Sequence, residues 1–376
     1  MSGTSLDGVD GVIYDFSDQS PRVSAFSNAP FPAELRAELL ALNSAGNNEL
    51  HRAALAANGL TRVYAQVVSQ LLALSNLKAR DITAIGAHGQ TVRHRPGEFD
   101  GTGYTLQLNS PALLAELTQI DVVADFRSRD VAAGGQGAPL VPAFHQDAFA
   151  NQNGANPSEA VAVLNIGGIS NLSVLGKAEP ALGFDCGPGN ALIDYWCHLH
   201  TGQLYDEDGQ WAASGHVNKT LLEQLLAEPF INKAPPKSTG RDLFNAVWLQ
   251  EKLQGYSSAA TQDVQATLTE FTAQACAENT KRYANSSKIL IVCGGGAQNA
   301  HLMLRLQVAL PNMKVTSSVA YGLQPLQVEA AAFAWLARKA TRRETASFKS
   351  VTGAQGSRIL GAIYPAWGYS LRSFKP

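Results

Sequence analysis

The pattern of apolar and polar positions predicts alternating strands and helices in the first half of the chain. Gly8–Phe16 is rich in β-forming residues, and the turn-forming run Ser17–Pro21 separates it from Arg22–Ser27, so these segments are expected to pair as a hairpin. A helix should follow, because apolar side chains recur at helical spacing at Leu60, Val63, Tyr64, Val67, Leu71 and Leu74. A strand at Ile82–Ala87, a helix around Leu113–Leu117 and a strand at Ile120–Ala124 complete the order β-β-α-β-α-β.

A similar order returns after the glycine-rich link Ala132–Pro139. Strands are predicted at Val161–Ile166, Leu172–Leu175 and Leu182–Asp185, and an irregular middle follows them. A helix then carries Val264, Leu268, Phe271 and Ala275 on one face, and after it come a strand at Lys288–Val292, a helix from Ala297 and a strand at Lys314–Thr316. The second half therefore reads β-β-β-α-β-α-β, a repeat of element order without visible sequence identity.

A repeated α/β order favours two similar lobes with a ligand between them. The halves differ at their first strand. In the second half the turn Gly167-Gly168 follows a full strand, whereas Gly3-Thr4-Ser5 follows only Met1-Ser2. We therefore expect the first lobe to lack its first strand, which exposes a sheet edge and weakens the support of the adjacent loop.

Composition and charge narrow the class of protein. The 376 residues are 45% hydrophobic and 16% charged, and 29 basic against 31 acidic side chains leave a net charge of −2. This balance provides no strong field for nucleic acid, no apolar run is long enough for a membrane span, and the N-terminus is unlike a secretory signal. The four cysteines form no disulfide framework and no C-x-x-C pair, so the chain is expected in the cytoplasm.

Three turns at predicted strand ends combine small and polar residues: Gly3–Gly8, Asn165–Asn171 and Cys293–Asn299. Glycines let backbone N–H groups approach an anion, and hydroxyl groups add donors, so such turns suit phosphates. Each could equally be an ordinary tight turn, and only their number favours phosphate binding. The motifs of P-loop, dinucleotide-binding and protein-kinase folds are absent.

Two aspartates are candidates for chemistry. Asp185 ends an apolar strand and precedes the rigid turn Gly187-Pro188-Gly189, so a fixed carboxylate could act as a general base; the alternative is a cap on the helix near Asn190. Asp7 could hold hydrated Mg²⁺ or could merely close an Asx-turn.

The first lobe also offers arginines, in Thr91–Pro96 and Ala124–Asp130, each expected after a strand and facing the cleft. A guanidinium there could clamp a carboxylate, although an ordinary surface ion pair is the alternative for each arginine. Glu329 precedes an almost wholly apolar helix, so its carboxylate needs a partner, either a ligand hydroxyl or a salt bridge.

These motifs together resemble the anhydro-N-acetylmuramic acid kinases. The similar blocks occur in the family's order: Met1–Asp10, Ala87–Thr91, Ala124–Arg127, Leu164–Asn171, Gly183–Asp185 with Gly187–Asn190, Pro236–Arg241, and Gly294–Gly296 with Asn299. No single block decides the matter, but their succession over nearly the whole chain argues against coincidence.

The resemblance implies an α/β, actin-like ATPase fold of two RNase H-like lobes with an interlobe cleft: residues 1–138 joined by 341–376, and residues 139–340. It implies an ATP-dependent kinase that opens 1,6-anhydro-N-acetylmuramic acid with water and phosphorylates it to N-acetylmuramic acid 6-phosphate, in the recycling of bacterial cell wall. ATP and Mg²⁺ are the implied cofactors, an amino sugar is the small-molecule partner, and a homodimer is the family expectation.

The resemblance also assigns roles to residues. Asp185 is the implied base that activates water, and Asp7 the implied Mg²⁺ contact through water. The implied sugar contacts are Arg127, Glu329, His88, Gln90 and Asn190. The implied ATP contacts are Gly3, Thr4, Ser5, Leu6, Asp7, Gly8, Val9, Asp10, Asn165, Gly167, Gly168, Gly294, Gly295, Gly296 and Asn299.

Two rival hypotheses remain at this point. One is a kinase of another sugar on the same fold, which a panel of sugars would separate. The other is a non-catalytic module switched by a nucleotide, like the Hsp70 ATPase lobes, which Asp185→Asn would distinguish.

Overall fold

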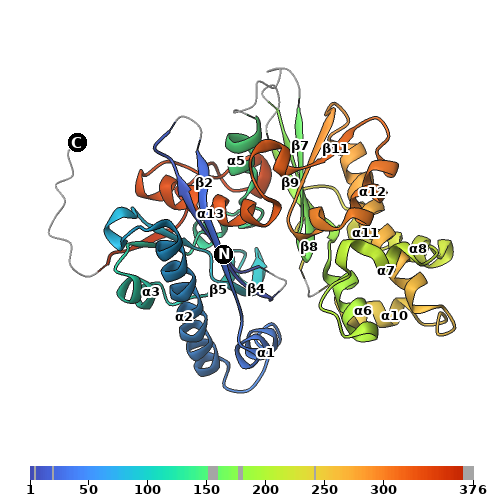
Figure 1. The fold of residues 1–376 in the computed structure, drawn as a ribbon, viewed down its shortest axis with the longest axis horizontal. Coiled ribbons are helices and arrows are strands. Elements are labelled where there is room, and N and C mark those ends of the chain that lie inside the picture. The colour runs from blue at the N-terminus through green and yellow to red at the C-terminus, as the bar shows by residue number, and fades with distance from the viewer. Residues whose placement is uncertain (4–5, 19–20, 151–159, 177–180, 241–242, 367–376) are drawn as a thin grey trace. The chain divides into compact units, whose positions relative to one another are not determined.

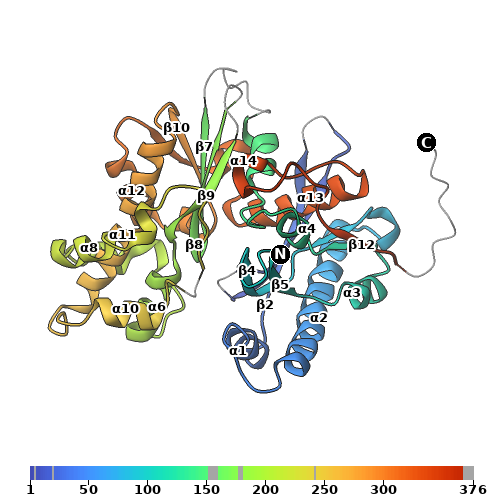
Figure 2. The ribbon, with the colours of Figure 1, turned by 180° about the vertical axis from the view of Figure 1, so that it is seen from behind.

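The computed structural model describes residues 1–3, 6–18, 21–150, 160–176, 181–240 and 243–366 (Figures 1 and 2). The chain forms two compact units. Unit 1 comprises Met1–Leu140 and Glu329–Pro376, and unit 2 comprises Val141–Val328. Strands and helices alternate in both, so the predicted α/β class is confirmed.

Unit 2 is built on one mixed sheet of five strands in the order β11-β10-β7-β8-β9. The strands are β7 (Val161–Ile166), β8 (Ile169–Leu175), β9 (Leu182–Pro188), β10 (Ile289–Cys293) and β11 (Lys314–Ser317). β7, β10 and β11 are parallel, while β8 is antiparallel to both β7 and β9. This order agrees with the RNase H-like lobe that the resemblance implied.

Helices cover this sheet. The core helix is α11 (Thr261–Tyr283), most of which is buried, and α12 (Ala300–Ala309) packs beside it. The middle of the unit, predicted to be irregular, is largely helical instead, with α6 (Ala191–Thr201), α7 (Gln210–Ala213), α8 (Lys219–Leu226), α9 (Pro229–Asn232) and α10 (Ala246–Lys252). These short helices enclose an apolar cluster together with α11, in which Phe244 packs edge-on against Trp248 and Trp248 stacks on Phe271, so tertiary packing decided their conformation.

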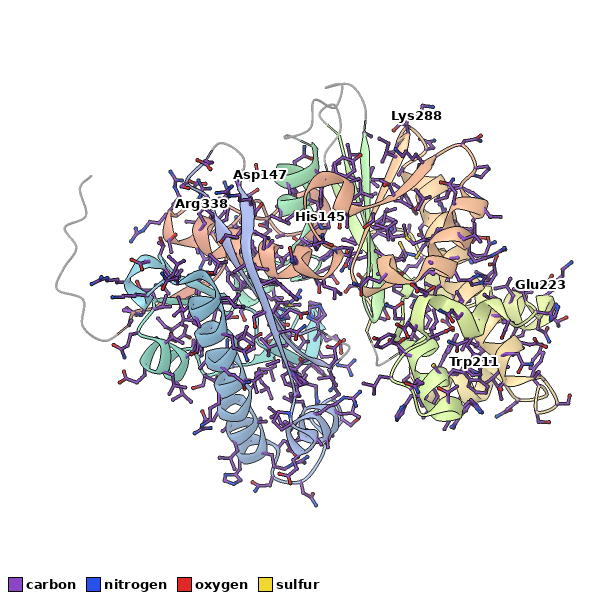
Figure 3. All side chains as sticks on the ribbon, viewed as in Figure 1. His145, Asp147, Trp211, Glu223, Lys288 and Arg338 are labelled. Atoms are coloured by element: carbon purple, nitrogen blue, oxygen red, sulfur yellow. The ribbon has the colours of Figure 1, made fainter. Side chains whose placement is uncertain are left out.

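Helix α5 (Pro142–His145) opens unit 2 and contacts β8. His145, labelled in Figure 3, is buried, and its Nδ1 lies 2.9 Å from the hydroxyl of Ser173. Burial lowers the pKa of His145 to about 3, so the imidazole stays neutral and serves as a packed polar contact.

Unit 1 has its strands in three separate sheets. β1 (Gly8–Asp15) and β2 (Arg22–Pro30) form the predicted hairpin; β4 (Gln90–Pro96) and β5 (Gly103–Leu108) form a second hairpin that the apolar pattern did not reveal. β3 (Ile85–Ala87), β6 (Val122–Ala124) and β12 (Ala362–Tyr364) form the third sheet, in the order β12-β6-β3. Among the described residues, β1 pairs with β2 alone and β3 pairs with β6 alone.

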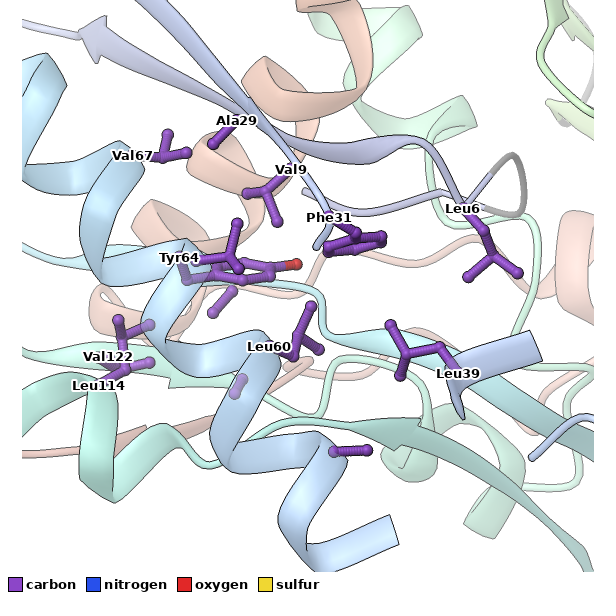
Figure 4. Packing of buried hydrophobic residues seen from close by; sticks show 14 of the residues in the cluster. Leu6, Val9, Ala29, Phe31, Leu39, Leu60, Tyr64, Val67, Leu114 and Val122 are labelled. Carbon is purple, nitrogen blue, oxygen red and sulfur yellow. The ribbon is translucent and has the colours of Figure 1, made fainter. Parts of the chain in front are cut away.

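The long helix α2 (Glu49–Ser75) contributes more residues than any other element to the buried apolar cluster of unit 1 (Figure 4). Leu60, Tyr64 and Val67 lie on one face of α2, as the helical spacing predicted. They belong to the same buried cluster as Val9 of β1 and Ala29 of β2. The remaining helices are α1 (Ala33–Ala41), α3 (Pro111–Thr118), α4 (Ser128–Ala132), α13 (Val328–Thr341) and α14 (Lys349–Thr352).

Helix α13 belongs almost wholly to unit 1, whereas the sequence analysis assigned residues 139–340 to the second lobe. The reason is packing: the ring of Phe333 lies 4.6 Å from that of His88 and 5.4 Å from that of Phe126. Gly86 of β3 also lies directly against the Phe333 backbone. Along the chain, the boundaries between the units fall between Leu140 and Val141 and between Val328 and Glu329. Within the described residues, none of the helices has both the length and the apolar character that a membrane span requires.

Candidate active site

Three glycine-containing turns meet at one end of the unit 2 sheet. β7 and β10 are parallel, so Gly167-Gly168 and Gly294–Gly296 leave the same edge. The turn that ends β9 joins them, because the N–H of Asn190 donates to the carbonyl of Gly167 at 2.8 Å and that of Gly189 donates to Gly168 at 2.9 Å. Two of the turns predicted from the sequence thus form one backbone-lined surface with a third.

Position 294 requires glycine because of its backbone conformation and its close neighbours. Its φ is 78°, in the left-handed region, and a Cβ there would lie 2.5 Å from Asn165 Oδ1 and 2.6 Å from the Ile166 carbonyl oxygen. Gly296 is nearly as constrained, since a Cβ would lie 2.4 Å from Ile166 Cγ2. Both contacts hold the β10 turn against the end of β7, which is the close approach that an anion-binding turn needs.

Asp185 lies on β9 beside these turns, opposite Asn171 of β8. The residue is 8% exposed, and its Oδ2 accepts hydrogen bonds from the backbone N–H of Thr239 at 2.9 Å and from the Ser238 hydroxyl at 3.1 Å. Helix α6 is capped by Asn190 and begins at Ala191, so these contacts are unlike those of a helix cap. The carboxylate is instead held in one orientation, as a general base requires.

The segment that orients Asp185 is itself anchored by Lys237. The Lys237 carbonyl accepts from the Asp185 N–H at 3.2 Å, and Lys237 Nζ donates to the carbonyl oxygens of Phe230 and Ile231 at 3.2 and 2.9 Å. Burial lowers the pKa of Lys237, while the neighbouring Cys186 and Asp185 raise it. Lys237, Ser238 and Thr239 lie in the segment Pro236–Arg241 that resembles the family, but no role was predicted for them. That resemblance was the only sign in the sequence that they belong to the site.

The three predicted asparagines have different settings. Asn165 is buried beneath the β10 turn, where Cys293 Sγ lies 3.7 Å from its Oδ1. Asn190, predicted to contact the sugar, lies among the glycine turns, and its Nδ2 donates to the Ile166 carbonyl at 3.4 Å. Asn299, predicted to contact ATP, is the N-cap of α12, which begins at Ala300 and not at Ala297 as predicted, because Gly295–Gln298 forms a 3₁₀ turn.

Unit 1 brings its first loop against the turn that follows β3. Ser2 Oγ donates to the Gly89 carbonyl at 2.8 Å, and Gln90 Nε2 donates to the Gly3 carbonyl at 3.1 Å. The buried Tyr64 hydroxyl, which the sequence analysis treated as a core residue only, accepts from the Gly89 N–H at 3.2 Å. Gln90 Oε1 is buried and has no hydrogen-bond partner among the described residues. Thr4 and Ser5 lie outside the described residues, as does Arg241.

His88 and Arg127 form a fixed polar pair. Arg127 Nε and Nη2 lie 3.0 and 2.9 Å from His88 Nε2, and Arg127 Nη1 donates to the Gly137 carbonyl at 2.8 Å. Burial and then the charge of Arg127 hold the pKa of His88 well below its ordinary value. Because Arg127 can only donate, His88 Nε2 accepts and Nδ1–H faces the Ser2 carbonyl 3.2 Å away, which fixes the tautomer.

Carboxylates gather near the amino end of unit 1. Burial raises the pKa of Asp10 to about 6, the charge of the N-terminal amine lowers it, and Asp7 and Glu329 raise it. The same environment, again chiefly by burial, lowers the pKa of the Met1 amine to about 6. Asp7 is exposed, and its Oδ1 accepts from the Gly8 N–H at 3.0 Å. Glu329 thus has charged neighbours on its own unit, the kind of setting expected for a carboxylate that opens an apolar helix.

One arginine prediction is wrong. Thr91–Pro96 was expected to follow a strand and to face a cleft, but it lies within strand β4. Arg93 Nη2 lies 2.6 Å from Glu49 Oε1, and Arg93 Nη1 donates to the Leu42 carbonyl. It is the ordinary ion pair named as the alternative.

The chain is similar in sequence to known proteins over nearly its whole length. Residues 1–366 match the family model described as "Anhydro-N-acetylmuramic acid kinase". The chain is 66% identical to the anhydro-N-acetylmuramic acid kinase of Variovorax paradoxus over 371 residues, which cover 97% of this chain and 98% of that protein. It is 64% identical to the corresponding protein of Albidiferax ferrireducens, with the same coverage of both. A solved structure of (R)-2-hydroxyglutaryl-CoA dehydratase component A from Acidaminococcus fermentans has a TM-score of 0.45 and 12% identity over 87% of this chain and 96% of that one.

Proposed function

Because the chain belongs to the anhydro-N-acetylmuramic acid kinase family, we propose that it transfers the terminal phosphate of ATP to anhydro-N-acetylmuramic acid and opens the anhydro bridge with water in the same reaction. The chain is a phosphotransferase of this family, and the reaction belongs to peptidoglycan recycling. The ring opening and the residues that perform it are our proposal and go beyond the membership of the family.

The observation that carries the proposal is the fixed carboxylate of Asp185 beside the glycine turns of unit 2. Asp185 takes a proton from water as the water oxygen bonds to the anomeric carbon. The bond from that carbon to the bridging 6-oxygen breaks, and the 6-oxygen bonds to the terminal phosphorus of ATP as ADP leaves. Phosphoryl transfer needs mainly positioning and charge neutralisation, so one base is sufficient for both events.

The turns at Gly167-Gly168 and Gly294–Gly296 supply backbone N–H groups, and we assign them to the ATP phosphates together with Asn165, while Asn190 keeps its assignment to the sugar. Asn299 caps α12, so its part in ATP binding is indirect, through the position of the Gly294–Gly296 turn. On unit 1 we assign Gly3–Asp10 to ATP, with Thr4 and Ser5 carried on the family resemblance alone.

Asp7 is the one described residue that we assign to Mg²⁺. No group of three or more potential ligands occurs within the described residues, and Mg²⁺ usually keeps its waters and binds one or two carboxylates with substrate phosphates. The exposed carboxylate of Asp7 suits such a contact through water. The ion would neutralise charge on the transferring phosphate.

The other predicted sugar contacts, Arg127, Glu329, His88 and Gln90, belong to unit 1. Arg127 is held in place by His88 and the Gly137 carbonyl, and a guanidinium suits the lactyl carboxylate of the sugar. The unsatisfied Oε1 of Gln90 can accept from a sugar hydroxyl. Glu329 is assigned to another hydroxyl. The homodimer and the cytoplasmic location are family expectations; sedimentation at several protein concentrations checks the first.

The test is mass spectrometry of the product formed from anhydro-N-acetylmuramic acid and Mg·ATP in ¹⁸O-labelled water. One labelled oxygen is expected at the anomeric position and none in the phosphate group. Rapid borohydride reduction prevents later exchange through the open-chain aldehyde, and unlabelled product incubated in the same water measures the exchange that remains. Label in the phosphate, or a phosphorylated product whose bridge is intact, would contradict the proposal.

A panel of sugars separates this activity from that of a general sugar kinase. The open N-acetylmuramic acid keeps the N-acetyl and lactyl groups, N-acetylglucosamine keeps the N-acetyl group but lacks the lactyl ether, and neither has a bridge to open. ADP release with either one at a rate equal to that with the anhydro sugar would favour the broader activity.

A further inference from the structure

Asp185 lies where the sheet of unit 2 holds it least firmly. β9 is at the end of the strand order, so among the described residues β8 pairs with it on one side only. Asn171 of β8 lies opposite Asp185. The residue before it, Ser170, lies opposite Gly187, so Cys186 is the extra residue of a β-bulge. Because a bulge interrupts the ladder next to the proposed base, the sheet alone does not fix the carboxylate.

Residues 237–239, which we call the strap, run along the outer edge of β9 and hold Asp185 at two positions. The Lys237 carbonyl accepts from the Asp185 backbone N–H at 3.2 Å. The Thr239 N–H and the Ser238 hydroxyl donate to the carboxylate Oδ2 at 2.9 and 3.1 Å. The backbone and the side chain of the proposed base are therefore both held by the same three residues.

The side chain of Lys237 fastens the strap to the rest of unit 2. It is 3% exposed, and its Nζ donates to the carbonyls of Ile231 and Phe230 in α9 at 2.9 and 3.2 Å. The same Nζ lies 5.0 Å from the ring centroid of Phe230 and 5.6 Å from that of Phe184, the residue before Asp185 on β9. The ammonium group thus connects the strap both to α9 and to the strand that carries the proposed base.

A buried ammonium group is unfavourable unless other contacts replace its lost hydration. Within the described residues, carbonyl oxygens and aromatic rings replace it here, and no ion pair contributes. An apolar side chain of the same length would fill the space without this loss. Burial lowers the pKa of Lys237, whereas Cys186 and Asp185 raise it, so its charge lies close to the proposed base. A role at the site explains the buried lysine better than packing does.

We propose that Lys237 is a positioning residue for the ring-opening step, because its buried ammonium group holds the strap against β9 and thereby fixes the carboxylate of Asp185. The inference rests on the proposed function, in which Asp185 takes a proton from water. Lys237 acts through the strap and needs no contact with either substrate. The ATP phosphates are assigned to the glycine turns, so loss of Lys237 should lower kcat and leave the KM for ATP unchanged.

The experiment replaces Lys237 with methionine, which keeps the length of the side chain and removes its charge and its donors. With anhydro-N-acetylmuramic acid and Mg·ATP, kcat should fall about 10- to 100-fold, because a displaced base no longer reaches the water. Lys252→Met is the matched control. Lys252 Nζ also lies over an aromatic ring of unit 2, 5.4 Å from the centroid of Trp248, but it pairs with Glu228 and not with the strap. Its replacement should leave kcat unchanged.

The same substitution is then made in Asp185→Asn. If Lys237 acts through Asp185, the double variant should have the kcat of Asp185→Asn within about threefold, because a base that is already lost cannot be displaced. A further fall as large as that in the wild type would show that Lys237 supports the fold in general, and it would overturn the proposal. An unchanged kcat in Lys237→Met alone would overturn it too.

Hydrogen exchange without substrates measures the strap directly. The amides of Asp185 and Thr239 should exchange at least about tenfold faster in Lys237→Met than in the wild type, while those of β7 keep their rates. Equal rates at Asp185 and Thr239 would overturn the proposal even if Asp185 is the base. Full activity of Asp185→Asn would instead reject the proposed base and this inference with it, so the two failures are distinguishable.

If Lys237→Met does not fold, Lys237→Gln is taken through the same measurements, because its amide keeps a donor for one of the α9 carbonyls. The criteria are unchanged. A fall in kcat that is absent in the Asp185→Asn background, with faster exchange at Asp185 and Thr239, supports the proposal. A wild-type kcat or wild-type exchange at these two amides rejects it.

Discussion

The two units share an order of elements but differ in how far their own strands complete a sheet. Unit 2 has one continuous five-stranded sheet, and its glycine turns leave a single edge that backbone hydrogen bonds hold together. Unit 1 has three separate sheets, and side chains such as Tyr64, His88 and Gln90 hold its first loop in place. A site supported by a complete sheet is fixed by backbone geometry, whereas one supported by side chains depends on their protonation and packing. Perturbing each unit separately tests this difference.

The largest effect is expected from Asp185→Asn in unit 2. The amide still accepts from the Thr239 N–H, so the fold should be retained, but it is a poor base, and kcat should fall about 10²–10⁴-fold. The rate of product formation and the affinity for ATP are measured together. Asp208→Asn, an exposed aspartate of the same unit at φ 53°, is the control and should leave both unchanged. Full activity of Asp185→Asn would show that Asp185 is not the base, whereas unchanged ATP affinity in the variant with no product from the wild type would favour the nucleotide-switched module.

Gly294→Ala should cost unit 2 more than about 3 kcal/mol. The left-handed backbone alone costs alanine about 1–2 kcal/mol, and the new Cβ also meets Asn165 and the Ile166 carbonyl. Gly322→Ala is the matched control, because Gly322 has φ 82° in the same unit with nothing within 4 Å of a Cβ. Urea unfolding measures both. Equal losses of unfolding free energy in the two variants would mean that the close approach of the β7 and β10 turns does not contribute to stability.

Unit 1 should respond to pH through Asp10. Its folded pKa of about 6 lies above the ordinary value of 3.8, so its contribution to stability is complete below pH 3.8 and is lost as the pH rises through about 6. The loss is at most about 3 kcal/mol. The difference in unfolding free energy between the wild type and Asp10→Asn, followed from pH 3.5 to 7, reports Asp10 together with its interaction with the Met1 amine, because the opposite effect of His88 is common to both proteins. A constant difference across this range would show that Asp10 is not desolvated in the folded chain.

The smallest effects should come from ion pairs. In unit 2 burial raises the pKa of Glu270, but hydrogen bonds from Arg305 and Gln274 bring it below its ordinary value. A double-mutant cycle with Glu270→Gln and Arg305→Met should give a coupling of about 1.5–3 kcal/mol, since Glu270 is only 4% exposed. The more exposed pair Arg93–Glu49 of unit 1 should give less than about 1 kcal/mol. The reverse order would contradict the burial argument.

The sequence by itself determined the class of fold, the order of the strands and long helices, and the family. Periodicity was sufficient for α2 and for the buried strands of unit 2, since a continuous apolar face or run admits few alternatives. The glycine turns were also visible, because glycines are local features, whereas Asp185, predicted to end its strand, lies in the middle of β9, which continues to Pro188.

Only the tertiary structure decided the rest. The β4-β5 hairpin and the helices between β9 and α11 depend on contacts distant in sequence, as does the assignment of α13 to unit 1 through Phe333. Arg93 and Arg127 have similar sequence surroundings, yet one pairs with Glu49 and the other with His88. The donors that orient Asp185 come from Ser238 and Thr239, more than fifty residues away in the chain. Such partners are set by how the chain returns on itself, which no local pattern of side chains specifies.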